Sequence, residues 1–261
     1  MCRLYFYKAI DMKRMYFAIS ILVILLCGSL GLNIWLYNIS YRQYIKTESL
    51  RFDPYELNNY PESPDIFKKD RLKSLVVFFG DSRAAAWPEI ADISYDFANR
   101  GINGQTTNQV LQRLPAHVAT LSPKVVVIQV GVNDLKNIVI FPDRAQSIVA
   151  NCKQNIQQIV EKLTQELQTT VVITTIFPAG ELSLLRRLYW TTEIDRSIIE
   201  VNQFIKSLKS DRIIILDAAT ILADERGVTR SEYSQDHLHL NAIGYTKLNN
   251  ELEQILKSLV R

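Results

Sequence analysis

From about residue 74 onward, the hydrophobic residues fall into five short runs, separated by longer stretches in which apolar residues recur at helical spacing. The runs are mostly apolar and rich in β-branched residues, which predicts strands buried on both faces of a parallel sheet, at residues 74–79, 93–98, 124–130, 171–177 and 212–216. The stretches between them predict amphipathic helices, the clearest at residues 110–118, 145–167, 194–208 and 241–259. This alternation predicts an α/β domain of three layers (α/β/α), with a five-stranded parallel sheet in the middle.

The N-terminal part of the chain has a different pattern, because residues 16–37 contain no charged residue. A segment of this length can cross the hydrocarbon core of a bilayer as a helix. It is preceded by four cations, so the positive-inside rule predicts a cytoplasmic N-terminus and export of the rest of the chain; they are Arg3, Lys8, Lys13 and Arg14. The alternative is a signal sequence cleaved near the small residues 27–31. The apolar run continues past that point to Tyr37, which favours a retained anchor.

Between the apolar segment and the first predicted strand, residues 38–73 are polar and contain Pro54, Pro61 and Pro64. Each proline biases the residue before it away from helix, so we expect a partly extended linker. The predicted organisation is therefore a cytoplasmic N-terminus, a transmembrane anchor or signal sequence, a linker and one catalytic domain, at residues 1–15, 16–37, 38–73 and 74–261.

Overall charge and cysteine content exclude several classes of partner. The net charge of +3 is small and no run of Lys and Arg is present, so no nucleic-acid partner is expected. Of the three cysteines, only Cys152 lies in the predicted domain. A disulfide within the domain is therefore impossible, and zinc ligation by thiolates is not expected.

Polar residues of chemical interest follow the predicted strands. Ser82 follows the first strand, Gly104 the second and Asn133 the third, while Asp236 and His239 lie three residues apart near the C-terminus. A serine nucleophile needs a base, and the base needs a carboxylate that fixes its tautomer. Acyl transfer also needs donors for the oxyanion, which the N–H groups of Ser82 and Gly104 and the side chain of Asn133 could supply.

Other polar groups have simpler interpretations. His237 and His239 could bind a metal together with Asp236, but no further His or Cys lies nearby, so no metal is expected. We expect Asp81 and Asp134 to accept hydrogen bonds from loop amides, and His117 to lie at the surface or fill the core. Residues 179–192 are unusually apolar for a loop and predict a short helix packed on the domain. The alternatives are a flap over the active site or a surface that touches lipid.

Four blocks of sequence resemble the SGNH/GDSL hydrolase superfamily in the same order: Gly80-Asp-Ser82, Gly101-Ile-Asn-Gly104, Gly131-Val-Asn-Asp134 and Asp236-His-Leu-His239. The resemblance implies a flavodoxin-like sheet, Ser82, Asp236 and His239 as the catalytic residues, and an oxyanion hole formed by Ser82, Gly104 and Asn133. Arg83 departs from the name-giving motif of the family, which has Leu at that position, and it places a cation beside the nucleophile.

The sequence therefore predicts a membrane-anchored, exported serine esterase or acylhydrolase that needs no cofactor. The substrate could be a lipid, an acetylated polysaccharide or a small ester, and the sequence predicts neither the choice among them nor the oligomeric state. One alternative is an O-acyltransferase or deacetylase acting on cell-envelope polysaccharide. Another is a non-catalytic envelope-binding module that keeps the fold.

Overall fold

The computed structural model describes residues 2–60, 73–91 and 93–259, in two compact units, Met1–Pro54 and Tyr55–Arg261. The first unit is formed by one helix, α1 (Cys2–Phe52), which from Met12 onward is long and apolar enough to cross a membrane. A signal sequence has the same properties. The helix continues past the predicted span, because no proline interrupts it before Pro54. The first part of the predicted linker is thus helical, and residues 61–72 of that linker lie outside the described residues.

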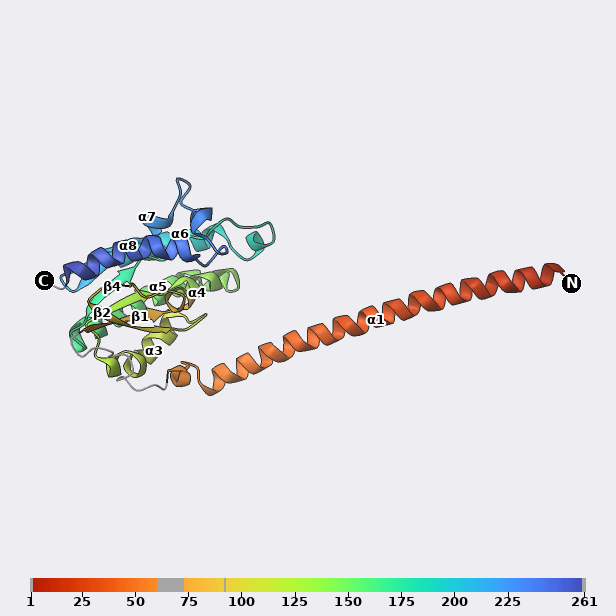
Figure 1. Cartoon of the computed structure of the whole chain (residues 1–261), viewed down its shortest axis with the longest axis horizontal. Helices are drawn as coiled ribbons and strands as arrows, with labels where there is room; N and C mark the ends of the chain where they lie inside the picture. Colours follow the sequence, from red (N-terminus) through yellow and green to blue (C-terminus); the bar gives the residue numbers. More distant parts are fainter. Residues whose placement is uncertain (1, 61–72, 92, 260–261) are drawn as a thin grey trace. The chain divides into compact units, whose positions relative to one another are not determined.

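The second unit contains the five-stranded parallel sheet that the sequence predicts (Figure 1). Its strands are β1 (Ser74–Gly80), β2 (Tyr95–Gly101), β3 (Val125–Gln129), β4 (Thr170–Thr174) and β5 (Ile213–Leu216). The spatial order is β2-β1-β3-β4-β5, and every neighbouring pair is parallel. This is the flavodoxin-like order that the family resemblance implies.

Two strands end elsewhere than predicted, for local reasons. β2 continues through the polar residues Asn99 and Arg100 to Gly101, because its backbone still pairs with β1 there and an edge strand tolerates polar side chains. β4 ends before Ile176, whose N–H and C=O groups bond to the side chain of Asn202 at 2.7 and 2.9 Å instead of to a neighbouring strand.

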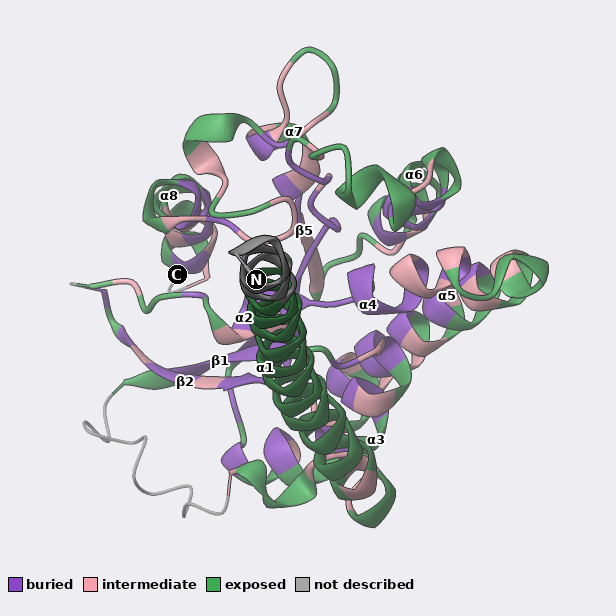
Figure 2. Ribbon diagram, turned by 90° about the vertical axis from the view of Figure 1, so that its right-hand side faces the viewer, coloured by how far each residue is buried: buried purple, intermediate pink, exposed green. Residues whose placement is uncertain are grey.

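Helices cover both faces of the sheet, which confirms the three-layer prediction. One core contains alternate β1 residues such as Val77 and Phe79 and the buried faces of α3 (Thr107–His117), α5 (Ala145–Glu161) and α6 (Thr192–Ser207). The other core contains Val76 and Phe78 with α7 (Ala218–Leu222) and α8 (Ala242–Ser258). Figure 2 shows the buried strands between helices whose outer faces are exposed.

Residues 179–192 do not form the packed helix that the sequence predicts. Only Arg186–Leu188 makes a turn of 3-10 helix, and the neighbouring apolar side chains are exposed, namely Leu184, Leu185, Leu188 and Tyr189. Ala179 and Trp190 join the core at the two ends of the segment. With only its ends buried, the segment has no continuous apolar face that could stabilise a helix.

Gly80 determines where β1 ends. Its φ of +150° is rarely adopted by other residues, and a Cβ atom here would lie 1.8 Å from the carbonyl oxygen of Gln129 on β3. The close approach of the two backbones therefore requires glycine at the last position of β1.

We predict that Gly80→Ala lowers the free energy of unfolding by about 3 kcal/mol or more, because a backbone clash adds to the strain of a positive φ. Gly227→Ala is the matched control, since Gly227 has a φ of +77° but open space around its Cβ position. The control isolates the backbone strain and should cost about 1 kcal/mol. Urea denaturation measures both. Equal losses in the two variants would contradict the importance of the contact between Gly80 and Gln129.

Candidate active site

The candidate site lies where β1, β2 and β3 end side by side. Gly80 is in register with Gly101 on β2 and with Gln129 on β3, so the loops that follow these strands begin at one level. The order of the sheet also reverses here, since the chain passes from β1 to β2 on one side and returns to β3 on the other. Ligands of open α/β sheets bind at the carboxyl ends of the strands at such a reversal.

Ser82 begins the short helix α2 (Ser82–Ala85) directly after β1. Its Oγ lies 3.0 Å from Nε2 of His239, and Nδ1 of His239 lies 2.9 Å from Oδ2 of Asp236. The structure thus brings together the three residues that the sequence predicts as catalytic, although 157 positions separate Ser82 from His239.

A tight loop fixes Asp236 and His239. Ser234 and Leu240 form an isolated antiparallel bridge that closes it. Within the loop, Oδ1 of Asp236 accepts hydrogen bonds from the N–H groups of Leu238 at 2.7 Å and His239 at 2.8 Å. One carboxylate oxygen thus stabilises the loop, while the other faces the imidazole.

The hydrogen bonds of this loop fix the orientation of the imidazole and the ionisation of its partner carboxylate. Burial opposes ionisation of Asp236, but hydrogen bonds from the His239 side chain and from the backbone of Leu238 and His239 outweigh it and lower its pKa to about 2. The carboxylate can only accept, so Nδ1 of His239 donates to it and Nε2 is left to accept from the Ser82 hydroxyl. This arrangement can remove a proton from Ser82.

The predicted oxyanion donors lie on the neighbouring loops. Gly104 has a φ of +81°, is exposed, and has open space at its Cβ position. Asn133 is buried at the start of α4 (Val132–Leu135), and its Nδ2 donates to the backbone carbonyl of Gln105 at 3.0 Å. Asn133 is therefore bonded to the residue that follows Gly104.

Arg83 does not face the nucleophile as a free cation. Its side chain is fully buried and donates from Nε to the carbonyl of Leu238 at 2.9 Å and from Nη1 to the carbonyl of Phe177 at 3.1 Å. Its guanidinium also lies 4.8 Å from the centre of the Phe177 ring. Arg83 thus connects α2, which contains Ser82, by a hydrogen bond to the loop that contains His239. Sequence reasoning missed this role, although a charged residue at the end of a buried strand could have indicated it.

Two buried carboxylates, Asp81 and Asp134, are sequence neighbours of the predicted site residues Ser82 and Asn133. Burial raises the pKa of Asp81 to about 6, against the opposing effects of the Arg83 guanidinium and backbone N–H. Burial likewise raises the pKa of Asp134 to about 6, although Asp134 accepts hydrogen bonds from the hydroxyl and N–H of Thr107 at 2.6 and 2.9 Å. Both carboxylates therefore accept hydrogen bonds from loop or helix-start amides, as the sequence predicts.

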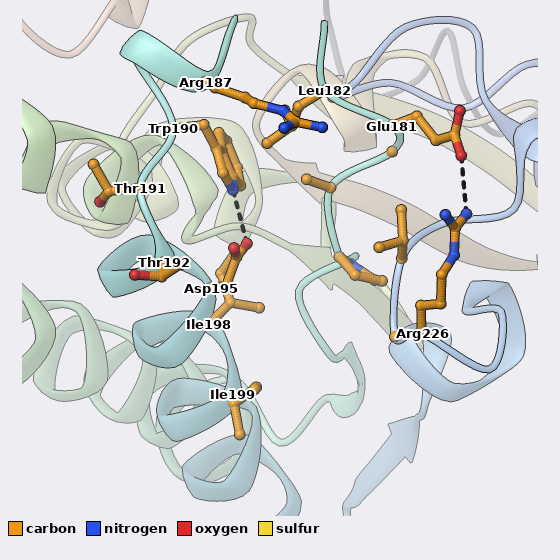
Figure 3. A pocket seen from close by; sticks show the side chains of 15 residues that line it. Glu181, Leu182, Arg187, Trp190, Thr191, Thr192, Asp195, Ile198, Ile199 and Arg226 are labelled. Carbon is orange, nitrogen blue, oxygen red and sulfur yellow. Dashed lines mark hydrogen bonds and ion pairs between the residues drawn. The ribbon is translucent and has the colours of Figure 1, made fainter. Parts of the chain in front are cut away.

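His237 packs with its ring edge-on to Trp190, with the ring centres 6.0 Å apart. Trp190 also lines a pocket of about 780 Å³ beside the loop (Figure 3). An ion pair between Glu181 and Arg226 and a hydrogen bond from Trp190 to Asp195 border it. Neither Ser82 nor His239 lines this pocket. Within the described part of the chain, no group of three or more His, Cys, Asp and Glu residues could hold a metal ion.

Comparison with known proteins identifies the family. A model of the GDSL-like lipase/acylhydrolase family matches residues 73–247, so the chain belongs to this family and is a hydrolase. The alpha1 subunit of platelet-activating factor acetylhydrolase IB from Rattus norvegicus is 29% identical over 194 residues, which cover 71% of this chain and 76% of the relative.

Solved structures share the fold. A GDSL-like lipase from Bacteroides thetaiotaomicron has a TM-score of 0.60 at 20% identity, covering 78% of this chain and 98% of the other. An acetyl xylan esterase has a TM-score of 0.55 at 22% identity, covering 69% and 98%. The match of the family model confirms the predicted family resemblance, and these structures confirm the fold.

We predict that Arg83→Met lowers the free energy of unfolding by about 3 kcal/mol, because the carbonyls of Leu238 and Phe177 lose their donor and Asp81 loses a nearby buried cation. Arg83→Lys should recover little, since an ammonium cannot reproduce the forked geometry of a guanidinium. Arg226→Met is the control, because its ion pairs are exposed and should contribute less than about 1 kcal/mol. Chemical denaturation of the three variants measures these differences. An Arg83→Met variant as stable as the control would contradict the assignment.

Proposed function

We propose that this acylhydrolase is an exported, membrane-anchored esterase that cleaves its substrate through Ser82, His239 and Asp236. The observation that carries the proposal is the unbroken line of contacts from the Ser82 hydroxyl through His239 to Asp236. A binding module has no need of a serine, a histidine and a carboxylate in this order of contact.

In the proposed reaction, Nε2 of His239 takes the proton of the Ser82 hydroxyl while Oγ attacks the ester carbonyl carbon. The tetrahedral oxyanion is stabilised by the N–H groups of Ser82 and Gly104 and by the side-chain amide of Asn133. His239 then donates its proton to the leaving alcohol, which leaves an acyl group on Ser82. A water molecule, deprotonated by His239, attacks the carbonyl carbon of this acyl group. The bond from that carbon to Oγ then breaks, His239 returns the proton to Oγ, and the carboxylic acid is released. The ionised Asp236 stabilises the imidazolium that forms in each step.

Membrane anchoring and export form the second part of the proposal. The support is the long apolar stretch of α1 and the cations Lys13 and Arg14 that precede its most apolar part. By the positive-inside rule, the hydrolase domain would lie outside the cytoplasm. The names of two similar proteins, an acetylhydrolase and an acetyl xylan esterase, favour an ester with a short acyl group as the substrate.

We predict that the full-length chain in detergent hydrolyses p-nitrophenyl acetate, and that Ser82→Ala lowers kcat by roughly a thousandfold or more because it removes the nucleophile. Ser207→Ala, which changes an exposed serine on α6, is the matched control and should keep full activity. A spectrophotometric assay with esters of increasing acyl length measures both. Equal turnover by the native chain and Ser82→Ala would refute the proposed nucleophile, and no turnover at any length would favour a transferase or a binding module.

A further inference from the structure

The residues that precede the family domain contact the loop that carries Gly104. Residues 55–60, which we call the collar segment, lie outside the family match at residues 73–247 and belong to the predicted linker. They nevertheless fall within the same compact unit as the hydrolase domain. The segment contains the short 3-10 helix η1 (Leu57–Asn59).

Three hydrogen bonds join the collar segment to the two ends of the loop 101–105. At one end, the hydroxyl of Tyr60 donates to the carbonyl of Gly101, the last residue of β2. At the other end, Nε2 of Gln105 donates to Oε2 of Glu56 at 2.8 Å and to the carbonyl of Tyr55 at 3.3 Å. Gly104 lies between these two points, so the collar segment holds the loop on both sides of the proposed oxyanion donor.

Gln105 connects this contact to the rest of the candidate site. Its side chain is buried, and its Oε1 accepts a hydrogen bond from Nε of Arg113 at 2.5 Å. Its backbone carbonyl accepts the hydrogen bond from Asn133 at 3.0 Å. Glu56, Gln105 and Asn133 therefore form a chain of contacts from the collar segment to a second proposed oxyanion donor.

The negative charge of Glu56 also favours its position, because the buried cation Arg113 lies nearby. Arg113 is fully buried and donates from Nη2 to the carbonyl of Gly80 and from Nη1 to that of Arg100, both at 2.8 Å. Burial lowers its pKa to about 10, and the nearby Tyr60 and Glu56 oppose that effect. The carboxylate of Glu56 thus lies close enough to stabilise a buried cation that touches the ends of both β1 and β2. A buried cation without such compensation is costly.

The packing around His117 fixes the collar segment in this position. Nδ1 of His117 lies 3.2 Å from Nη1 of Arg113, which can only donate, so Nε2 carries the proton and donates to the carbonyl of Leu57 at 3.0 Å. The Tyr60 ring packs edge-on to the His117 ring, and the guanidinium of Arg100 lies 4.4 Å from the centre of the Tyr60 ring. Glu56 itself adopts a left-handed conformation with a φ of 54°, which positions its side chain at a local conformational cost.

We propose that the collar segment is part of the catalytic unit and that Glu56 is a positioning residue, which acts through Gln105 to hold Gly104 and Asn133 in place for the oxyanion. This inference rests on the proposed function, because it assumes that these two groups stabilise the transition state. It also implies that the functional domain begins at about residue 55, before the point where the family match starts.

The test uses the full-length chain in detergent, with p-nitrophenyl acetate as substrate. Glu56→Ala should lower kcat about tenfold with little change in KM, because misplaced oxyanion donors weaken binding of the transition state more than binding of the substrate. Glu56→Gln should restore part of the loss, since an amide oxygen can accept the same hydrogen bond from Gln105 but carries no charge to stabilise Arg113. Glu89→Ala, which removes an exposed carboxylate elsewhere on the domain, should behave as the native chain.

Hydrogen exchange supplies a readout that does not depend on activity. In Glu56→Ala the amides of residues 101–105 should exchange faster than in the native chain, while those of α8 stay unchanged. Tyr60→Phe gives a milder second variant, because it removes the bond to Gly101 but keeps the ring, and it should also lower kcat and speed exchange in the same loop. If Glu56→Ala does not fold, Tyr60→Phe alone tests the proposal.

The outcomes separate the two proposals. An active native chain whose Glu56→Ala and Tyr60→Phe variants keep native kcat and native exchange would overturn the positioning role and leave the esterase proposal intact. A native chain without activity, together with faster exchange in Glu56→Ala, would support the structural contact but overturn both the esterase proposal and the catalytic consequence of the contact. A fall in kcat that Glu56→Gln partly restores supports the proposal.

Discussion

The candidate site depends on the close approach of three parallel strands at the end of β1. Gly80 is in register with Gly101 and Gln129, and its backbone lies so near that of Gln129 that only a glycine fits. Because the strands end at one level, the loops after them start side by side, and Ser82, Gly104 and Asn133 reach the same edge of the sheet. The C-terminal loop then needs only to supply Asp236 and His239.

Two buried arginines connect the ends of these strands to the surrounding loops by hydrogen bonds. Arg83 connects the residues after β1 to the carbonyls of Leu238 and Phe177, and Arg113 connects the ends of β1 and β2 to Gln105. Buried guanidinium groups require acceptors for their hydrogen bonds, so each arginine fixes the backbone around it. The catalytic geometry is therefore maintained by charged groups that do not themselves face the substrate in the proposed reaction.

The sequence predicted the sheet and its helices because these depend on short apolar runs and on helical periodicity. It predicted the grouping of Ser82, Asp236 and His239 through the resemblance of four sequence blocks to the SGNH/GDSL superfamily. It did not predict the hydrogen bonds that charged side chains make within the domain, such as those of Arg83 with Leu238 and of Glu56 with Gln105. A charged side chain usually indicates an exposed position. It also gave the wrong structure for residues 179–192, where apolar residues indicated a packed helix but most side chains are exposed. α1 continues beyond residues 16–37 because a change from apolar to polar residues ends a possible membrane span but does not by itself end a helix.

The central claim is that Ser82 is a nucleophile activated by His239. The most direct measurement is reaction of the full-length chain with a fluorophosphonate, followed by mass spectrometry of its peptides, because this reagent bonds covalently to activated serines. We expect a single modified residue, Ser82, and much slower labelling in a His239→Ala variant. Labelling of another serine, such as Ser234, or equal labelling rates with and without His239, would contradict the account.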